Sequence, residues 1–165
     1  MTLQKQMAQQ IREAYFGGNW TAVNVKDALS GVTWKQARTK VFDLNTIAAL
    51  VFHINYYISP ALNVLHGKPP ASSDSLSFAV PSTESESDWQ NLFAKVMEDA
   101  ESFAAEIEKL DETKFFETFW DEKYGNVFKN IDGIIEHTYY HLGQIVLIKK
   151  ILTASNSTDQ TNPDS

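Results

Sequence analysis

Apolar residues recur at intervals of three and four along four long stretches of the chain, and they do not alternate as in a β-strand over any useful length. Such spacing places apolar side chains on one face of an α-helix. We therefore expect an all-α protein whose long helices bury these faces against one another as a four-helix bundle. The predicted helices run over about 2–16, from 43 to 66, from 81–83 to 110, and from 127 to 152.

The sequence also indicates where these helices end or break. Asp43 is expected to cap the second long helix, and Pro60 should kink it because proline removes one backbone hydrogen bond. Two shorter helical stretches are expected near 21–29 and just after Thr33. Residues 153–165 are polar and hold no core residue, so we expect a flexible tail after a single domain that spans 1–152.

The connections between the long helices constrain the topology. Residues 67–83 are rich in proline and serine and should form a long loop, which could reach roughly 55 Å when fully extended. Residues 111–126 are rich in aromatic side chains and are expected to be a packed connection that fills the core or, alternatively, covers a pocket. Two long crossover connections favour a topology other than simple up-down-up-down.

Charge and composition argue against several classes of function. The chain has 14 Lys and Arg against 21 Asp and Glu, a net charge of -7, and no basic face that would suit DNA, RNA or an anionic membrane. No apolar run is long enough to span a bilayer, and the N-terminus lacks an export signal, so we expect a cytoplasmic protein. The absence of cysteine excludes disulfides, a thiolate nucleophile and a cysteine-type zinc site.

Three of the four histidines fall where a core-facing apolar residue is expected. His137 and His141 are four residues apart on the last helix and share one face, and His53 points inward from the second helix. Two imidazoles at this spacing can converge on one metal ion, and a third from a facing helix would leave positions open for water or substrate. His66, at a helix end, faces elsewhere and is expected only to complement the helix dipole.

This pattern has a simpler explanation, because inward histidines are often hydrogen-bonded core residues. Buried imidazoles without partners are costly, however, and a metal would satisfy one nitrogen of each ring while an acceptor takes the other. The third inward histidine, His53, favours a metal site. Tyr57 and Gln144 lie on the same faces as the histidines and are candidates to orient a substrate or a ligand, or else are packing residues with satisfied polar tips.

The histidines and the residues around them resemble a known family. The stretches "IIEHTYYHLGQIVLIKK" and "AALVFHINYYI" are similar to the DinB superfamily of metal-dependent enzymes, which has one histidine in the second helix and His-x-x-x-His-x-Gly-Gln in the fourth. The resemblance also takes in "GNWTAVNVKDALSGVTWKQA" and "SDWQNLF" and ends near Leu152. In this chain the motif consists of His53, His137 and His141, followed by Gly143 and Gln144.

The resemblance implies a four-helix bundle in which two helices run parallel after a long crossover. It implies that His53, His137 and His141 bind a divalent metal, with zinc or nickel expected first and manganese or iron as further candidates. Relatives in the family include thiol-dependent S-transferases and isomerases that use bacillithiol or mycothiol. A small-molecule substrate, a low-molecular-weight thiol and a homodimer are therefore expected on the same basis.

A three-histidine metal site can acidify water for hydrolysis or stabilise a thiolate for transfer. A hydrolase often also needs a carboxylate near the water, but Glu136 points away on the helical wheel and Asp43 is expected to be a cap. This slightly favours thiol transfer, although a loop could supply a carboxylate. Three alternatives remain: a metal-dependent transferase or hydrolase, a non-catalytic metal or small-molecule binding bundle, and a helical protein with core histidines.

Overall fold

The long amphipathic segments form helices in a computed structural model that describes residues 1–158, with side chains as far as Ala154. The described residues contain no β-strand, so the expected all-α class is confirmed. Three 3-10 helices, η1 (Asp74–Leu76), η2 (Glu112–Phe116) and η3 (Glu122–Tyr124), lie in the two long connections. The α-helices are α1 (Leu3–Phe16), α2 (Val25–Leu29), α3 (Trp34–Arg38), α4 (Ile47–Tyr56), α5 (Ile58–Leu65), α6 (Glu86–Glu108) and α7 (Val127–Thr158).

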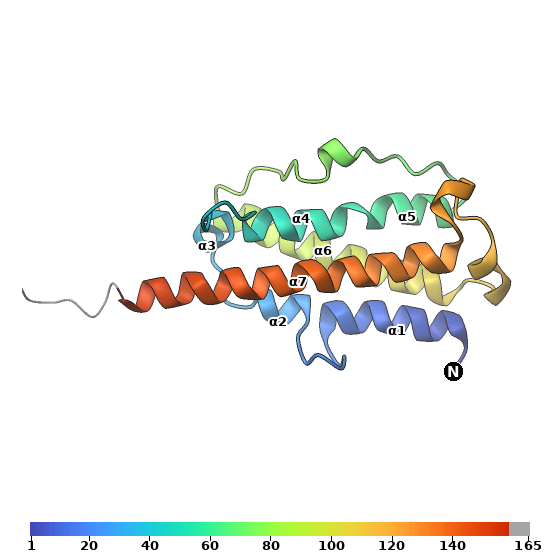
Figure 1. The fold of residues 1–165 in the computed structure, drawn as a ribbon, viewed down its shortest axis with the longest axis horizontal. Helices are drawn as coiled ribbons and strands as arrows, with labels where there is room; N and C mark the ends of the chain where they lie inside the picture. Colours follow the sequence, from blue (N-terminus) through green and yellow to red (C-terminus); the bar gives the residue numbers. More distant parts are fainter. Residues whose placement is uncertain (159–165) are drawn as a thin grey trace, which may run out of the picture.

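The long helices lie side by side, and the connection between α5 and α6 runs back along the outside of α4 and α5 (Figure 1). We call this connection, residues 66–85, the crossover. Because the crossover returns the chain to the start of α4, α6 runs in the same direction as α4 and α5 (Figure 1). The helix α7 packs against both α4 and α1.

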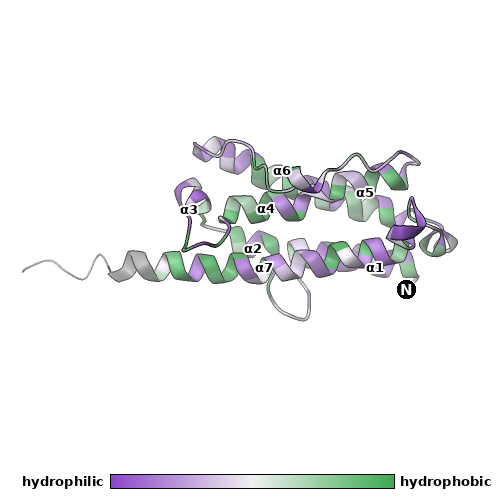
Figure 2. Cartoon of the chain, turned by 45° about the horizontal axis from the view of Figure 1, so that its top comes forward, coloured by the Kyte–Doolittle hydropathy of each residue, from purple (hydrophilic) through white to green (hydrophobic). Residues whose placement is uncertain are grey.

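The core lies between α1, α4, α6 and α7, where each helix buries one apolar face. In Figure 2 hydrophobic and hydrophilic residues share the same helices, as amphipathic helices require. The buried residues of α6 follow the spacing that predicted this helix, and they are Trp89, Val96, Ala100, Phe103, Ala104 and Ile107. The connection 111–126 adds the fully buried Phe115 to the same core.

Side-chain caps decide where the helices begin. The Ser85 hydroxyl accepts the backbone N–H of Asp88 and starts α6 at Glu86, a few residues later than the proline that suggested its start. The acidic residues of this first turn suit the positive end of the helix dipole. Thr33 and Gln36 form a reciprocal capping box at α3, which confirms the short helical turn expected there.

The predicted second helix, 43–66, is found as α4 and α5, but it begins later than expected. Thr46, rather than Asp43, caps α4, because its hydroxyl accepts the backbone N–H of Ala49. The expected interruption by Pro60 is present one turn upstream, where α4 ends at Tyr56 and α5 begins at Ile58. Proline lacks the N–H that would bond the carbonyl four residues before it, which here is that of Tyr56. Pro60 then lies in the first turn of α5, where a missing N–H costs no helical hydrogen bond.

The last helix is longer than expected. The sequence predicted its end near Leu152, whereas α7 continues to Thr158. The predicted polar tail therefore begins as helix, and its remaining residues, 159–165, lie outside the described part of the chain.

The segment Ile47–Leu65, which contains α4 and α5, is long and apolar enough by composition to cross a membrane. In this structure the two helices pack against α6 and α7. Buried core helices commonly meet the same criterion of length and composition, so this segment is weak evidence for a membrane span.

The fully buried ring of Phe103 should be one of the larger contributors to stability. Replacing it in Phe103→Ala should lower the free energy of unfolding by about 3–5 kcal/mol, because the cavity left in a close-packed core adds to the lost burial. The matched variant Phe116→Ala, at a ring that is 68% exposed, should change stability by less than about 0.5 kcal/mol. Urea denaturation followed by circular dichroism measures both, and equal losses would contradict this description of the core.

Candidate metal centre

The structure brings together the three histidines that the sequence singled out. His53 comes from the middle of α4, and His137 and His141 come from successive turns of α7. Their ligand nitrogens all lie within 4.8 Å of one another, and the Nε2 atoms of His53 and His137 are 3.0 Å apart. His53 and His141 are buried, and His137 is half-buried. Three such donors could hold one metal ion.

The separations between these nitrogens suit a divalent ion. Metal–imidazole distances of about 2.0–2.1 Å, at angles of about 90–110°, correspond to nitrogen–nitrogen separations of about 3.0–3.4 Å. The 3.0 Å separation between His53 and His137 lies in this range. The upper limit of 4.8 Å for the group is wider, so the rings would need a modest rotation to close on an ion.

Hydrogen bonds on the far side of two rings determine which nitrogen faces the centre. The Nδ1–H of His53 donates to the backbone carbonyl of Ser77 at 3.2 Å, and the Nδ1–H of His141 donates to the Oε1 of Gln144 at 3.0 Å. Because each neutral ring carries one proton, both Nε2 atoms are left with a free lone pair. Acceptors of this kind typically fix the tautomer and orientation of metal-binding histidines.

Burial favours the neutral form of two rings of the cluster, His137 and His53. Burial lowers the pKa of His137 to about 4, with the neighbouring rings of His141 and His53 as further causes. Burial is also the main cause that lowers the pKa of His53. Neutral imidazole is the form that ligates a metal, so these nitrogens are available at neutral pH. Without a metal, His137 can donate its Nε2 proton to the Nε2 of His53. This hydrogen bond would satisfy both rings if they were only core histidines.

Aromatic rings surround the cluster and restrict its motion. Phe78, from the crossover, stacks on His53 with ring centroids 3.8 Å apart. Tyr57 meets both His53 and His137 edge-on, at 5.6 Å and 5.4 Å. Of the two candidate partners from the sequence, Tyr57 therefore contacts two of the rings, and Gln144 is hydrogen-bonded to the third. The remaining histidine, His66, lies outside the cluster at the end of α5, where it pairs with Glu106.

The crossover supplies residues that the helical pattern could not identify. In η1, the Asp74 backbone carbonyl accepts both the N–H and the hydroxyl of Ser77, the residue whose own carbonyl holds His53. The Asp74 carboxylate accepts a hydrogen bond of 3.4 Å from the Tyr57 hydroxyl. Thus a loop supplies a carboxylate that contacts Tyr57 and lines the same cavity as His137, which the helices alone did not predict. Glu136, the candidate weighed from the sequence, is exposed.

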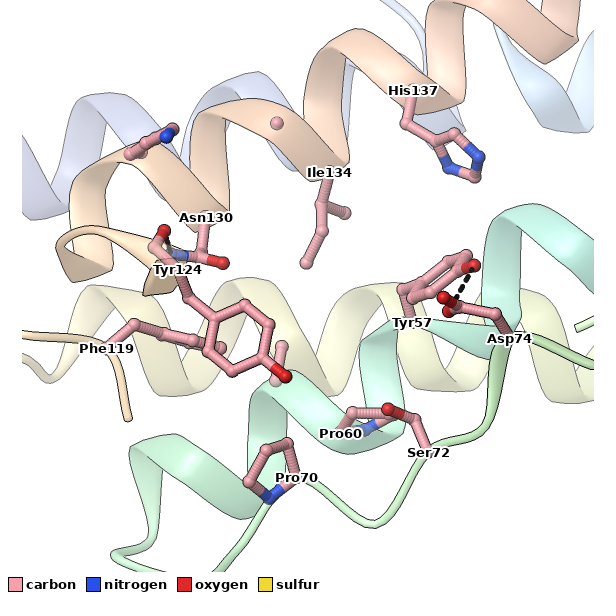
Figure 3. A pocket seen from close by; sticks show the side chains of 13 residues that line it. Tyr57, Pro60, Pro70, Ser72, Asp74, Phe119, Tyr124, Asn130, Ile134 and His137 are labelled. Carbon is pink, nitrogen blue, oxygen red and sulfur yellow. Dashed lines mark hydrogen bonds between the residues drawn. The ribbon is translucent and has the colours of Figure 1, made fainter. Parts of the chain in front are cut away.

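A cavity of about 510 Å³ opens next to the cluster and is lined by His137, Tyr57 and Asp74 at one end (Figure 3). Figure 3 shows Asn130, Tyr124 and Phe119 around the other end, with Pro60 and Pro70 along the side. Phe119 belongs to the aromatic connection 111–126, whose role the sequence left open between core filling and covering a pocket. In the structure Phe119 lines this cavity and Phe115 fills the core.

Comparisons of the chain with models of known protein families, with curated proteins and with solved structures gave no match. The resemblance to the DinB superfamily therefore stays a prediction from the sequence.

The contact between Gln144 and His141 should matter for metal affinity. In Gln144→Leu the Nδ1–H of His141 loses its acceptor, and affinity for zinc should fall about tenfold to a hundredfold while one ion per chain is still bound. Competition with a chromophoric chelator measures the affinity. The control is Gln90→Leu, at an exposed glutamine that pairs with Glu86 on α6, and it should leave the affinity unchanged. Equal affinities in both variants would show that Gln144 does not support the site.

Proposed function

We propose that the protein is a divalent-metal-dependent enzyme, a four-helix bundle of the DinB type whose three-histidine site lies beside a substrate cavity. The observation that carries this proposal is the anchoring of His53 and His141 at Nδ1, which directs both Nε2 lone pairs to the point that His137 also faces. The parallel course of α4–α5 and α6 after the crossover is what the resemblance led us to expect, and it supports the proposed bundle.

The number of donors favours catalysis over a purely structural role. The cluster offers three histidine nitrogens, whereas structural zinc sites are closed by four protein ligands. His137 also lines a cavity large enough for a small molecule, so a substrate in that cavity would lie next to the proposed metal site. Zinc and nickel both suit a set of three imidazoles, and manganese and iron are further candidates.

Asp74 favours hydrolysis over thiol transfer. When bound, the ion would polarise a substrate carbonyl and acidify the attacking nucleophile. The Asp74 carboxylate accepts a hydrogen bond from the Tyr57 hydroxyl and lines the same cavity. In the proposed reaction one of its oxygens would accept a proton from a water molecule. Phe78, stacked on His53, holds that ring against sideways movement. Thiol transfer needs no such base and would take its thiol from outside, since the chain has no cysteine.

We propose a small-molecule substrate, a cytoplasmic location and a homodimer, and no nucleic-acid or membrane partner. The acidic net charge of -7 supports the last of these. A non-catalytic metal or small-molecule binding bundle is the alternative, and turnover distinguishes it from an enzyme.

The first test is metal content. Untagged protein loaded with zinc and dialysed should contain about one ion per chain by elemental analysis, and chelator treatment should remove it. His53→Ala and His137→Ala should lose stoichiometric binding and keep a helical circular-dichroism spectrum. The matched control, His66→Ala, should keep its metal, because this exposed histidine lies outside the cluster and pairs with Glu106. Full metal content in either cluster variant would contradict the ligand assignment.

The second test separates water from thiol. The zinc-loaded protein should hydrolyse 4-nitrophenyl acetate in a chelator-sensitive way, and Asp74→Asn should lower kcat/KM about a hundredfold at unchanged zinc content. Glu136→Gln, which removes the exposed carboxylate next to His137 in sequence, should have no effect. An unchanged rate in Asp74→Asn would exclude its role as base. Turnover that requires an added thiol and an electrophile would identify a transferase instead.

A further inference from the structure

The cavity beside the histidines follows α7 for more than two helical turns. His137, Ile134, Asn130 and Lys129 all line it. Eight residues separate His137 from Lys129, which corresponds to about 12 Å along the helix axis. A ligand that touches both ends must therefore be elongated.

Most of the wall between these ends is apolar. Pro60 and Ala61 line it from α5, Pro70 from the crossover, Ile134 from α7 and Phe119 from the aromatic connection. Such a surface binds a hydrocarbon or aromatic group most favourably, because binding removes apolar area of both partners from water. The middle of the ligand is thus expected to be apolar.

Lys129 is the cation at the far end of the cavity. The ion pairs of the described side chains do not include it, whereas its neighbour Lys123 lies 4.0 Å from Asp121 and above the ring of Tyr124. The turn before α7 fits closely around the Lys129 side chain. Gly125 has a φ of 78°, and a Cβ there would come within 2.9 Å of the Cδ of Lys129. Asn130 secures the same turn by donating to the carbonyls of Tyr124 and Asn126.

The two ends of the cavity carry opposite charges. Asp74 lies at the end that holds His137 (Figure 3), and Lys129 lies about 12 Å away along α7. An anionic group on a ligand would be repelled by Asp74 and attracted by Lys129. The charges therefore orient an elongated ligand as well as bind it. Its uncharged, reactive end would face the histidines.

We propose that the cavity binds an elongated molecule with an apolar body and one terminal carboxylate, which pairs with Lys129 while the opposite end reaches the three histidines. The part of this inference that concerns the histidine end rests on the metal-dependent function proposed above. The part that concerns Lys129 rests on the cavity itself. The substrate class is accordingly an apolar monocarboxylate with a hydrolysable group at its other end.

Two hydroxamates of equal chain length test this proposal. Suberic acid monohydroxamate and octanohydroxamic acid share the same metal-binding hydroxamate. The opposite end of the first is a carboxylate, and that of the second is a methyl group. Calorimetry with the zinc-loaded protein should give tighter binding of the carboxylate probe, and Lys129→Met should reduce this preference about fivefold, the range of a partly exposed ion pair. The affinity for octanohydroxamic acid should stay nearly constant.

The control is Lys114→Met, which makes the same change in net charge at an exposed lysine that pairs with Glu117 away from the cavity. It should keep the wild-type preference. Equal binding of both probes by the wild type, or a preference that survives in Lys129→Met, would overturn the role of Lys129 and leave the metal centre intact. Failure of both probes to bind protein that contains zinc would overturn the substrate class. Failure of the protein to take up zinc at all would refute the proposed function, and with it the histidine end of this inference.

Discussion

The site depends on the cost of placing imidazole rings inside an apolar core. An unpartnered polar group in such a place is expensive, so each ring must find a hydrogen-bond partner or a ligand. His53 meets this requirement through a backbone carbonyl of the crossover, and His141 meets it through a side chain one turn further along its own helix. These partners leave the opposite nitrogens facing one another. The hydrogen bonds that compensate for the burial of these rings therefore also determine the geometry of the centre.

The crossover links the helical core to the chemistry proposed for it. One short 3-10 turn holds the carbonyl that anchors His53 and also presents the Asp74 carboxylate to Tyr57. A displacement of this turn would therefore affect a ligand and the proposed base together. Pro70 and Ser72 of the same segment line the cavity. The crossover therefore helps to form both the histidine site and the cavity.

The sequence predicted those features that come from helical periodicity, and it could not predict those that come from the crossover. The inward positions of His53, His137 and His141 follow from their spacing among apolar residues, and the structure brings them together. The prediction that Asp43 caps this helix was wrong, because the hydroxyl of the nearby Thr46 accepts the backbone N–H of Ala49 instead. Both residue types are common caps, so the sequence alone does not decide between them. Asp74, Ser77 and Phe78 lie in an extended segment with no period, where only the path of the chain determines what each residue meets. Membership of the DinB superfamily remains a prediction, because it rests on the motif alone.

Three of the hydrogen bonds that attach the crossover to the helices beneath it use its own backbone. The Tyr56 hydroxyl accepts the N–H of Ser73 and donates to its carbonyl, both at 2.9 Å, and His53 donates to the carbonyl of Ser77. Attachments of this kind do not depend on which side chains the segment carries. The segment can thus exchange the residues that face the cavity while keeping its path, as an antibody loop does on a constant framework. One scaffold and one set of histidines could in this way diversify toward many different small molecules.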